Sequence, residues 1–135
     1  MIVVDSNVVA YLYMDAGYGP AAAALLERDQ DWIAPLLWRS ELRNVLAGGL
    51  RRRGLRIEEA RAIQSEAQAL MSDGEYEVDS DTVLDLVNRS DCSAYDCEYV
   101  ALAKQLGLKL VTMDRKVLQA FPEVAIPLAI EPAID

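Results

Sequence analysis

The most informative part of the chain is SAYDCEYVALAKQLGLKLVTMD, residues 93–114. In residues 94–106 the apolar side chains fall on every side of a helical wheel, which predicts a helix buried on all faces. Gly107 is a typical helix end, and the apolar run at residues 108–112 predicts a short strand directly after it. A buried helix that leads into a buried strand is typical of proteins in which helices cover a parallel sheet.

A carboxylate stands at each end of this part of the chain. Asp96 lies in the first turn of the predicted helix, and no Lys or Arg lies three or four residues from it. Asp114 follows the strand, at the end where open α/β sheets place their sites. Both acids also have a purely structural explanation, because Ser93 and Asp96 fit a capping box and Asp114 can N-cap the next helix. The other acids of the chain must decide between these interpretations.

Two further acids occur in similar surroundings. The apolar run at residues 1–4 ends at Asp5, and a helical pattern begins at Ser6. WIAP predicts another strand, and we expect a long helix to begin at its Pro35. Glu41 lies in the apolar face of that helix, again with no basic residue three or four positions away. The chain therefore has four acids in apolar sequence that lack a local cation.

The remaining sequence continues the alternation of strands and helices. This alternation predicts an α/β fold with a short, mainly parallel central sheet. The proline in the last predicted strand restricts that strand to an edge of the sheet. The further predicted elements are a helix from Pro20, a helix at residues 57–71 that forms a hairpin through Gly54, a strand or extended link at residues 76–78, a helix capped by Ser80, and the edge strand at residues 124–130 with Pro127.

The four acids are expected at one edge of that sheet. Asp5 and Asp114 follow parallel strands, the helix of Asp96 leads into the strand before Asp114, and Glu41 can reach the same edge. Carboxylates gathered in a poorly solvated cleft repel one another strongly unless a cation lies among them. Oxygen ligands of this kind suit hard cations, so we expect a pair of Mg²⁺ or Mn²⁺ ions.

Composition excludes several alternatives. The chain has no His, which excludes Ser-His-Asp and Cys-His catalysis and His-ligated zinc. Its two cysteines are too few for a disulfide framework. The length of 135 residues predicts one domain over residues 1–135. Although 53% of the residues are hydrophobic, no apolar run is long enough to span a membrane. MIVVDSN lacks the features of a signal peptide, so we expect a cytoplasmic protein.

Charge is distributed unevenly along the chain. The formal net charge is -9, which argues against non-specific binding to nucleic acid over the whole surface. Residues 39–61, however, contain seven basic and three acidic residues, a local net charge of +4. The run Arg51, Arg52 and Arg53 is therefore either a set of phosphate contacts or a solvated helix end whose charges complement the helix dipole.

Four motifs together resemble one known family. In chain order they are MIVVDSNVV, WRSELRNVL, SAYDCEYVALAKQLG and LVTMDRKVL. They resemble the PIN-domain family, and the short length is similar to its VapC-type toxin ribonucleases. The resemblance implies a three-layer α/β/α sandwich, Mg²⁺- or Mn²⁺-dependent cleavage of single-stranded RNA, a homodimer and an antitoxin partner. It also implies a catalytic and metal-binding set of Asp5, Glu41, Asp96 and Asp114, with Ser6, Asn7 and Thr112 as supporting polar residues.

The residues leave some roles and functions open. Asp5 and Asp96 would bind metal directly or bridge two ions, Asp114 would bind directly or through water, and Glu41 would bind metal or position the water. Asp91 and Glu98 either add a fifth acid to the site or are solvated surface charges.

Two other classes of function are also considered. One is a phosphotransferase with Asp5 as nucleophile, although Asn7 stands where haloacid-dehalogenase-like enzymes need Asp. The other is a non-catalytic protein, either a phosphoacceptor or a PIN-like binding module. A phosphoacceptor would need a Lys near the site after a late strand, and the segment LVTMD at residues 110–114 has only Lys109 before it and Lys116 after it. The four intact acids argue against the binding module.

Overall fold

Short strands form the centre of the molecule. The computed structural model describes residues 1–14 and 17–129. The described strands are β1 (Ile2–Val4), β2 (Trp32–Pro35), β3 (Glu75–Tyr76), β4 (Leu110–Val111) and β5 (Ala125–Ile126). They form one sheet in the order β3-β2-β1-β4-β5, and each neighbouring pair is parallel. The parallel sheet confirms the predicted α/β fold.

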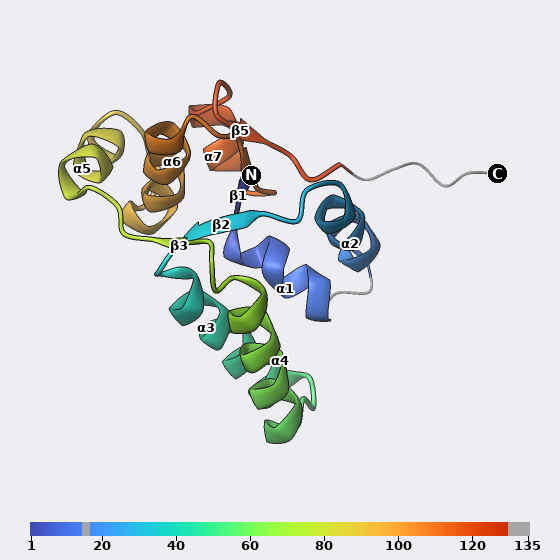
Figure 1. Ribbon diagram of the computed structural model, residues 1–135. Helices are drawn as coiled ribbons and strands as arrows, with labels where there is room; N and C mark the ends of the chain where they lie inside the picture. Colours follow the sequence, from blue (N-terminus) through green and yellow to red (C-terminus); the bar gives the residue numbers. More distant parts are fainter. Residues whose placement is uncertain (15–16, 130–135) are drawn as a thin grey trace.

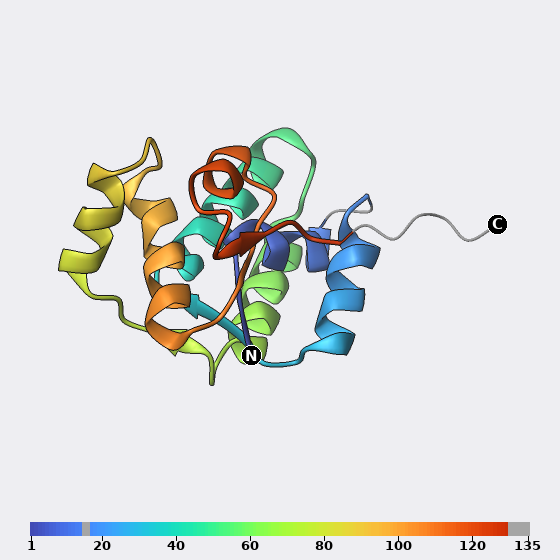
Figure 2. The ribbon, with the colours of Figure 1, turned by 90° about the horizontal axis from the view of Figure 1, so that it is seen from above.

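Helices cover the sheet on two sides. The described helices are α1 (Ser6–Met14), α2 (Gly19–Arg28), α3 (Trp38–Arg52), α4 (Ile57–Leu70), α5 (Ser80–Asn88), α6 (Ala94–Leu106) and α7 (Arg115–Ala120). In Figures 1 and 2, α5 and α6 lie on one side of the strands and α1 and α2 on the other. This arrangement is the predicted three-layer sandwich. None of the described helices combines the length and the hydrophobicity that crossing a membrane requires.

Helix α6 is the buried helix that its sequence predicts. Five consecutive side chains, residues 99–103, are buried, and five positions cover all sides of a helix. The helix contacts β1 and β2 and also packs along α5, which explains why its central part is buried on all sides, whereas Tyr95 and Lys104 near its two ends are exposed. It ends at Gly107, whose φ of 66° is the left-handed conformation that glycine adopts without strain. The chain then enters β4, which lies between β1 and β5 in the sheet.

Helices α3 and α4 form the predicted hairpin, which projects away from the sheet in Figure 1. The turn contains Gly54 with a φ of 70°. Helix α3 begins at Trp38, so the prediction that it begins at Pro35 is wrong. Pro35 is instead the last residue of β2 and lies opposite Tyr76 of β3. Its neighbours Ala34 and Leu36 donate the backbone hydrogen bonds to the β3 side, so the missing N–H of proline is not needed there.

Two other boundaries differ from the sequence prediction. Helix α5 is capped by Asp79, not Ser80, because the Asp79 carboxylate accepts the N–H of Thr82 at 3.0 Å. Ser80 is the first residue of the helix. The last strand, β5, occupies only two residues before Pro127, and it lies at an edge of the sheet as predicted. The predicted end of that strand, residue 130, lies outside the described residues.

Candidate active site

Asp5 lies at the carboxyl end of β1, beside the end of β4. Its backbone N–H donates to the carbonyl of Val111 at 3.0 Å, which continues the parallel ladder past β1. Three donors surround its carboxylate: the Thr112 hydroxyl at 2.8 Å, the Asn7 N–H at 3.3 Å and the Ser6 hydroxyl at 3.3 Å. Ser6 and Thr112 are themselves buried. The predicted supporting residues therefore hold Asp5 in one orientation.

Burial raises the pKa of the Asp5 carboxyl above its ordinary value. The hydrogen bonds from Thr112, Asn7 and Ser6 oppose this effect, because they stabilise the charged form. The negative charge of Asp96 raises the pKa further, so these two carboxylates are close enough to repel one another. Two of the four predicted acids, which are far apart in the sequence, are thus brought together.

Glu41 joins the same group from α3. Burial raises its pKa first, and the charges of Asp5 and Asp96 raise it further. A hydrogen bond from the Tyr99 hydroxyl acts in the opposite direction. That hydroxyl donates to Glu41 Oε1 at 2.6 Å, across 58 residues of sequence. Repulsion therefore contributes to the raised pKa values of Asp5 and Glu41, but burial is the larger cause, and Asp114 contributes to neither.

Tyr99 is the site residue that sequence reasoning missed. Its side chain is only 3% exposed, and burial together with the charge of Glu41 raises the pKa of its phenol strongly. The phenol therefore stays protonated and donates. The signal in the sequence is a Tyr on a fully buried helix, because a buried phenol nearly always has a hydrogen-bond partner. Its identity as the partner of Glu41 cannot be found without the fold.

Asp114 also carries a structural role, whereas the cap beside Asp96 uses only the backbone N–H of that residue. Ser93 caps α6 by accepting the N–H of Asp96 at 3.1 Å, which is one half of the predicted capping box. Asp114 caps α7 by accepting the N–H of Val117 at 3.1 Å, so the plain structural explanation is correct for this residue. Its own N–H donates to Thr112 Oγ1 at 3.1 Å. Thr112 therefore links Asp114 to Asp5 through two hydrogen bonds.

The carboxylate oxygens of the four acids are suitable ligands for a hard cation, but the acids do not form a ready-made metal-binding group. In the described ranges 1–14 and 17–129, no three Cys, Asp or Glu side chains form a group that could hold an ion. Asp5 and Glu41 use carboxylate oxygens to accept protein donors. An ionised carboxylate offers about four acceptor positions in all, so oxygen lone pairs remain for a metal.

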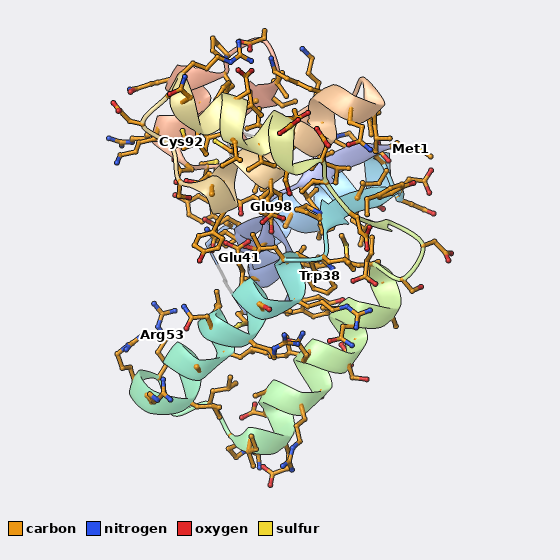
Figure 3. All side chains as sticks on the ribbon, turned by 90° about the vertical axis from the view of Figure 1, so that its left-hand side faces the viewer. Met1, Trp38, Glu41, Arg53, Cys92 and Glu98 are labelled. Atoms are coloured by element: carbon orange, nitrogen blue, oxygen red, sulfur yellow. The ribbon has the colours of Figure 1, made fainter. Side chains whose placement is uncertain are left out.

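A hollow of about 470 Å³ opens beside Glu41. A second hollow, of about 260 Å³, lies further along α3 and includes Arg52 and Arg53 in its lining. Arg51 is exposed and does not line it. Figure 3 shows Glu41 at the end of α3 nearest the sheet and Arg53 toward the turn of the hairpin. Arg51 and Arg52 of the predicted basic run thus lie on the same helix as Glu41, and Arg53 is the C-cap of that helix.

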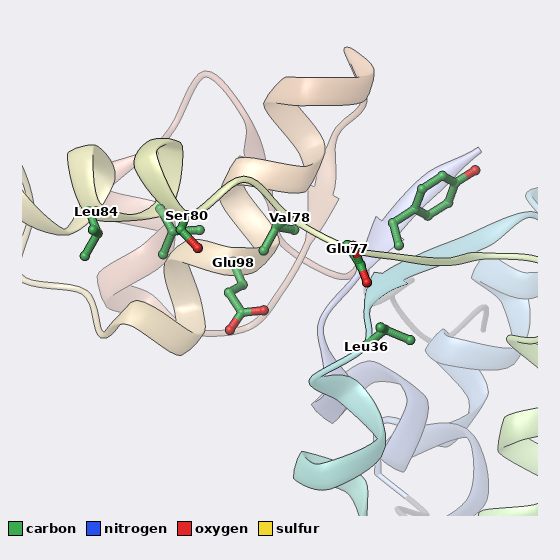
Figure 4. Close-up of a pocket in the computed structure, with 8 residues that line it drawn as sticks. Leu36, Glu77, Val78, Ser80, Leu84 and Glu98 are labelled. Atoms are coloured by element: carbon green, nitrogen blue, oxygen red, sulfur yellow. The ribbon is translucent and has the colours of Figure 1, made fainter.

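Glu98 belongs to a different part of the surface. It lines a hollow of about 470 Å³ together with Leu36, Val78 and Leu84, as Figure 4 shows. Burial raises the pKa of its carboxyl, so it is not simply a solvated surface charge. Asp91 is exposed.

Comparison with known proteins identifies the family. The profile of the PIN domain matches residues 2–126. The chain belongs to the PIN-domain family. This PIN domain is 32% identical over 130 residues to Ribonuclease VapC3 of Pyrobaculum aerophilum, which covers 93% of the chain and 98% of that protein. The family predicted from the four motifs, including the VapC-type branch, is confirmed.

Solved structures share the fold of this PIN domain. FitAcB from Neisseria gonorrhoeae superposes with a TM-score of 0.73 at 18% identity, over 93% of this chain and 96% of that one. A toxin-antitoxin complex from Klebsiella pneumoniae gives a TM-score of 0.69 at 15% identity, with the same coverage. At these identities the likeness concerns the fold alone.

Proposed function

We propose that this PIN domain, a single nuclease domain over residues 1–135, is a Mg²⁺- or Mn²⁺-dependent endoribonuclease that cleaves single-stranded RNA. The observation that carries the proposal is the placement of the Asp5 and Glu41 carboxylates at the carboxyl edge of the sheet, where Thr112 and Tyr99 hold them by hydrogen bonds. A chain without His needs another means of activating water, and a carboxylate-bound cation is such a means. The 32% identity to a VapC ribonuclease supports the same chemistry.

Asp5, Glu41, Asp96 and Asp114 would hold one or two ions, either directly or through water. When bound, such ions neutralise a phosphate and lower the pKa of a bound water, which makes the water nucleophilic near neutral pH. The chain's own residues fix the carboxylates. Thr112, Ser6 and Asn7 orient Asp5, and Tyr99 holds Glu41.

The alternative in which Asp5 is a phosphate-accepting nucleophile has less support. Both Asp5 oxygens already accept hydrogen bonds, and three donors restrain them. These donors lower the nucleophilicity of a carboxylate and limit its movement toward a phosphorus atom. The geometry therefore favours a metal-holding role for Asp5 over a covalent one.

A matched pair of variants on α6 tests the ribonuclease. Asp96→Asn removes a charge from the acid group, whereas Glu98→Gln removes one from the separate hollow two residues away. We expect wild type and Glu98→Gln to cleave unstructured RNA with Mg²⁺ or Mn²⁺, and Asp96→Asn to be inactive. Full cleavage in excess chelator, or equal activity in both variants, would contradict the metal-dependent site.

We also propose that the protein acts in the cytoplasm as the toxin of a type II toxin-antitoxin pair, is neutralised by an antitoxin protein, and forms a homodimer. Structures of the same fold include one titled a toxin-antitoxin complex, which supports the antitoxin partner. Sedimentation at tens of micromolar protein tests the dimer. A monomer at that concentration would contradict it, because stable interfaces have dissociation constants from roughly nanomolar to micromolar.

A further inference from the structure

We propose that Tyr95 is the stacking platform for a nucleobase beside the scissile phosphate, and that the RNA strand continues from there along α3 to Arg52 and Arg53. The inference rests on the proposed ribonuclease function and adds to it where the substrate lies. It starts from the exposure of Tyr95, whose side chain is 61% exposed immediately before Asp96. A large aromatic ring left in water next to a catalytic residue indicates a ligand with a flat face.

The hollow beside Glu41 matches a base in its chemistry. Tyr95 lines it together with the apolar side chains of Leu37 and Val45. Its polar lining includes neutral hydroxyl and amide groups, which both donate and accept hydrogen bonds, as the edges of bases do. Glu41 is the one charged residue in the lining among the described residues, so a phosphate would not be attracted here without a metal ion. The neutral polar residues are Ser6, Asn7, Ser40 and Asn44.

The second hollow on α3 matches a phosphate. It shares Asn44 and Val45 with the first hollow, so the two are continuous along the helix. Arg52 and Arg53 line it, and guanidinium groups bind phosphate in a bidentate way. Gly48 has no side chain and therefore leaves room in this hollow for the Arg52 guanidinium. A Cβ there would lie 2.7 Å from Arg52 Nη2, so glycine allows the guanidinium to lie against the helix.

The length and charge of this surface favour a strand of RNA over a protein segment. Residues 41 and 53 are about 18 Å apart along the helix axis at a rise of 1.5 Å per residue, and Figure 3 shows both ends. The surrounding segment, residues 39–61, has a net charge of +4 in a chain of net charge -9. Polyanions are therefore drawn to this part of the surface and repelled from the rest. A base-stacking ring followed by phosphate contacts is the usual arrangement for binding single strands.

Binding of a fluorescent RNA 12-mer of mixed sequence tests the subsite. It should be measured by anisotropy with Mg²⁺ in the Asp96→Asn background, where the RNA is not cut. We expect Tyr95→Ala to weaken binding about 5- to 150-fold, since stacking of one base contributes roughly 1–3 kcal/mol. Tyr95→Phe keeps the ring and should bind almost normally. Leu84→Ala is the matched surface control, because Leu84 is 62% exposed and lines the separate hollow that contains Glu98.

The outcomes separate this subsite from the proposed activity. Equal affinities of Tyr95→Ala and Tyr95→Phe would overturn the subsite and leave the hollow to a protein partner, whether or not the wild type cleaves RNA. If wild type does not cleave RNA but Tyr95→Ala binds RNA more weakly, the proposed ribonuclease function is wrong and the proposed base-binding role of Tyr95 stands. Melting temperatures of all variants should match their parent, because both substituted side chains are exposed.

Discussion

Removal of the Tyr99 hydroxyl is the sharpest test of how the acid group is held. Tyr99→Phe keeps the ring in the core and deletes only the oxygen that donates to Glu41 Oε1 at 2.6 Å. The carboxylate of Glu41 then loses its donor in partly buried surroundings where the charges of Asp5 and Asp96 already repel it. We expect the variant to be less stable than wild type and its Glu41 to be less well fixed in the proposed site.

The magnitude follows from the charge and the partial exposure of Glu41. A hydrogen bond to a charged group contributes roughly 1.5–3 kcal/mol, and water can replace part of it because Glu41 is not fully buried. We therefore expect a loss of about 1–2 kcal/mol in the free energy of unfolding at neutral pH. For 135 residues, an unfolding entropy of about 2.1 cal/mol/K per residue converts this loss to a decrease in Tm of about 4–7 °C.

The pH dependence of this loss has a definite sign. The Tyr99 hydroxyl lowers the pKa of Glu41 and partly offsets the effect of burial, so its removal raises that pKa further. A carboxyl with a raised pKa in the folded state contributes full stability below its unfolded pKa, near 4.5 here, and loses it as pH rises through the folded pKa. The deficit of Tyr99→Phe should therefore be largest near pH 7 and smaller near pH 4, where a neutral hydrogen bond contributes roughly 0.5–1.5 kcal/mol.

Thermal and urea unfolding of the metal-free protein at several pH values provide the measurement. Tyr95→Phe is the matched control, because it removes the same oxygen from an exposed position on the same helix. Combining Tyr99→Phe with Glu41→Gln, which keeps the acceptor oxygen and removes the charge, isolates the charge-assisted part of the interaction. Equal Tm values for Tyr99→Phe and Tyr95→Phe at pH 7, or a deficit that grows toward pH 4, would refute this account.

Three further expectations concern metal, RNA and the sheet. Mn²⁺ at 100 times its dissociation constant should stabilise wild type by about 2.7 kcal/mol in thermal melts. Asp96→Asn should lose most of this stabilisation. If Mn²⁺ stabilises the variant as much as wild type, Asp96 is not part of the metal site. Replacement of Arg52 and Arg53 with Gln should weaken RNA binding and flatten its dependence on salt in titrations, whereas an unchanged slope would assign these residues to a solvated helix end. Gly74→Ala should destabilise the fold strongly, because the added Cβ would overlap the backbone oxygen of Trp32. Urea denaturation at the wild-type midpoint would contradict this expectation.

Local signals predicted the elements better than their boundaries. The buried helix, the hairpin and the edge strand each follow from a pattern within a few residues, such as apolar residues on all sides of α6 or Pro127 after β5. The start of α3 was misplaced because Pro35 favours a helix start by its φ, while pairing with β3 placed it in a strand. Asp79 and Ser80 are both good caps, so the sequence alone could not choose between them.

The sequence by itself determined the family and the fold class, because motifs and hydrophobic periods are properties of local sequence, and it predicted the four acids as the site. Only the tertiary structure decided how those acids are held. Tyr99 meets Glu41 across 58 residues, and Thr112 meets Asp5 across 107. Contacts at such separations depend on which strands are neighbours in the sheet and which helices cover them. No pattern in the sequence connects two residues that meet only in the fold, because the neighbours of each residue along the chain carry no information about its distant partner.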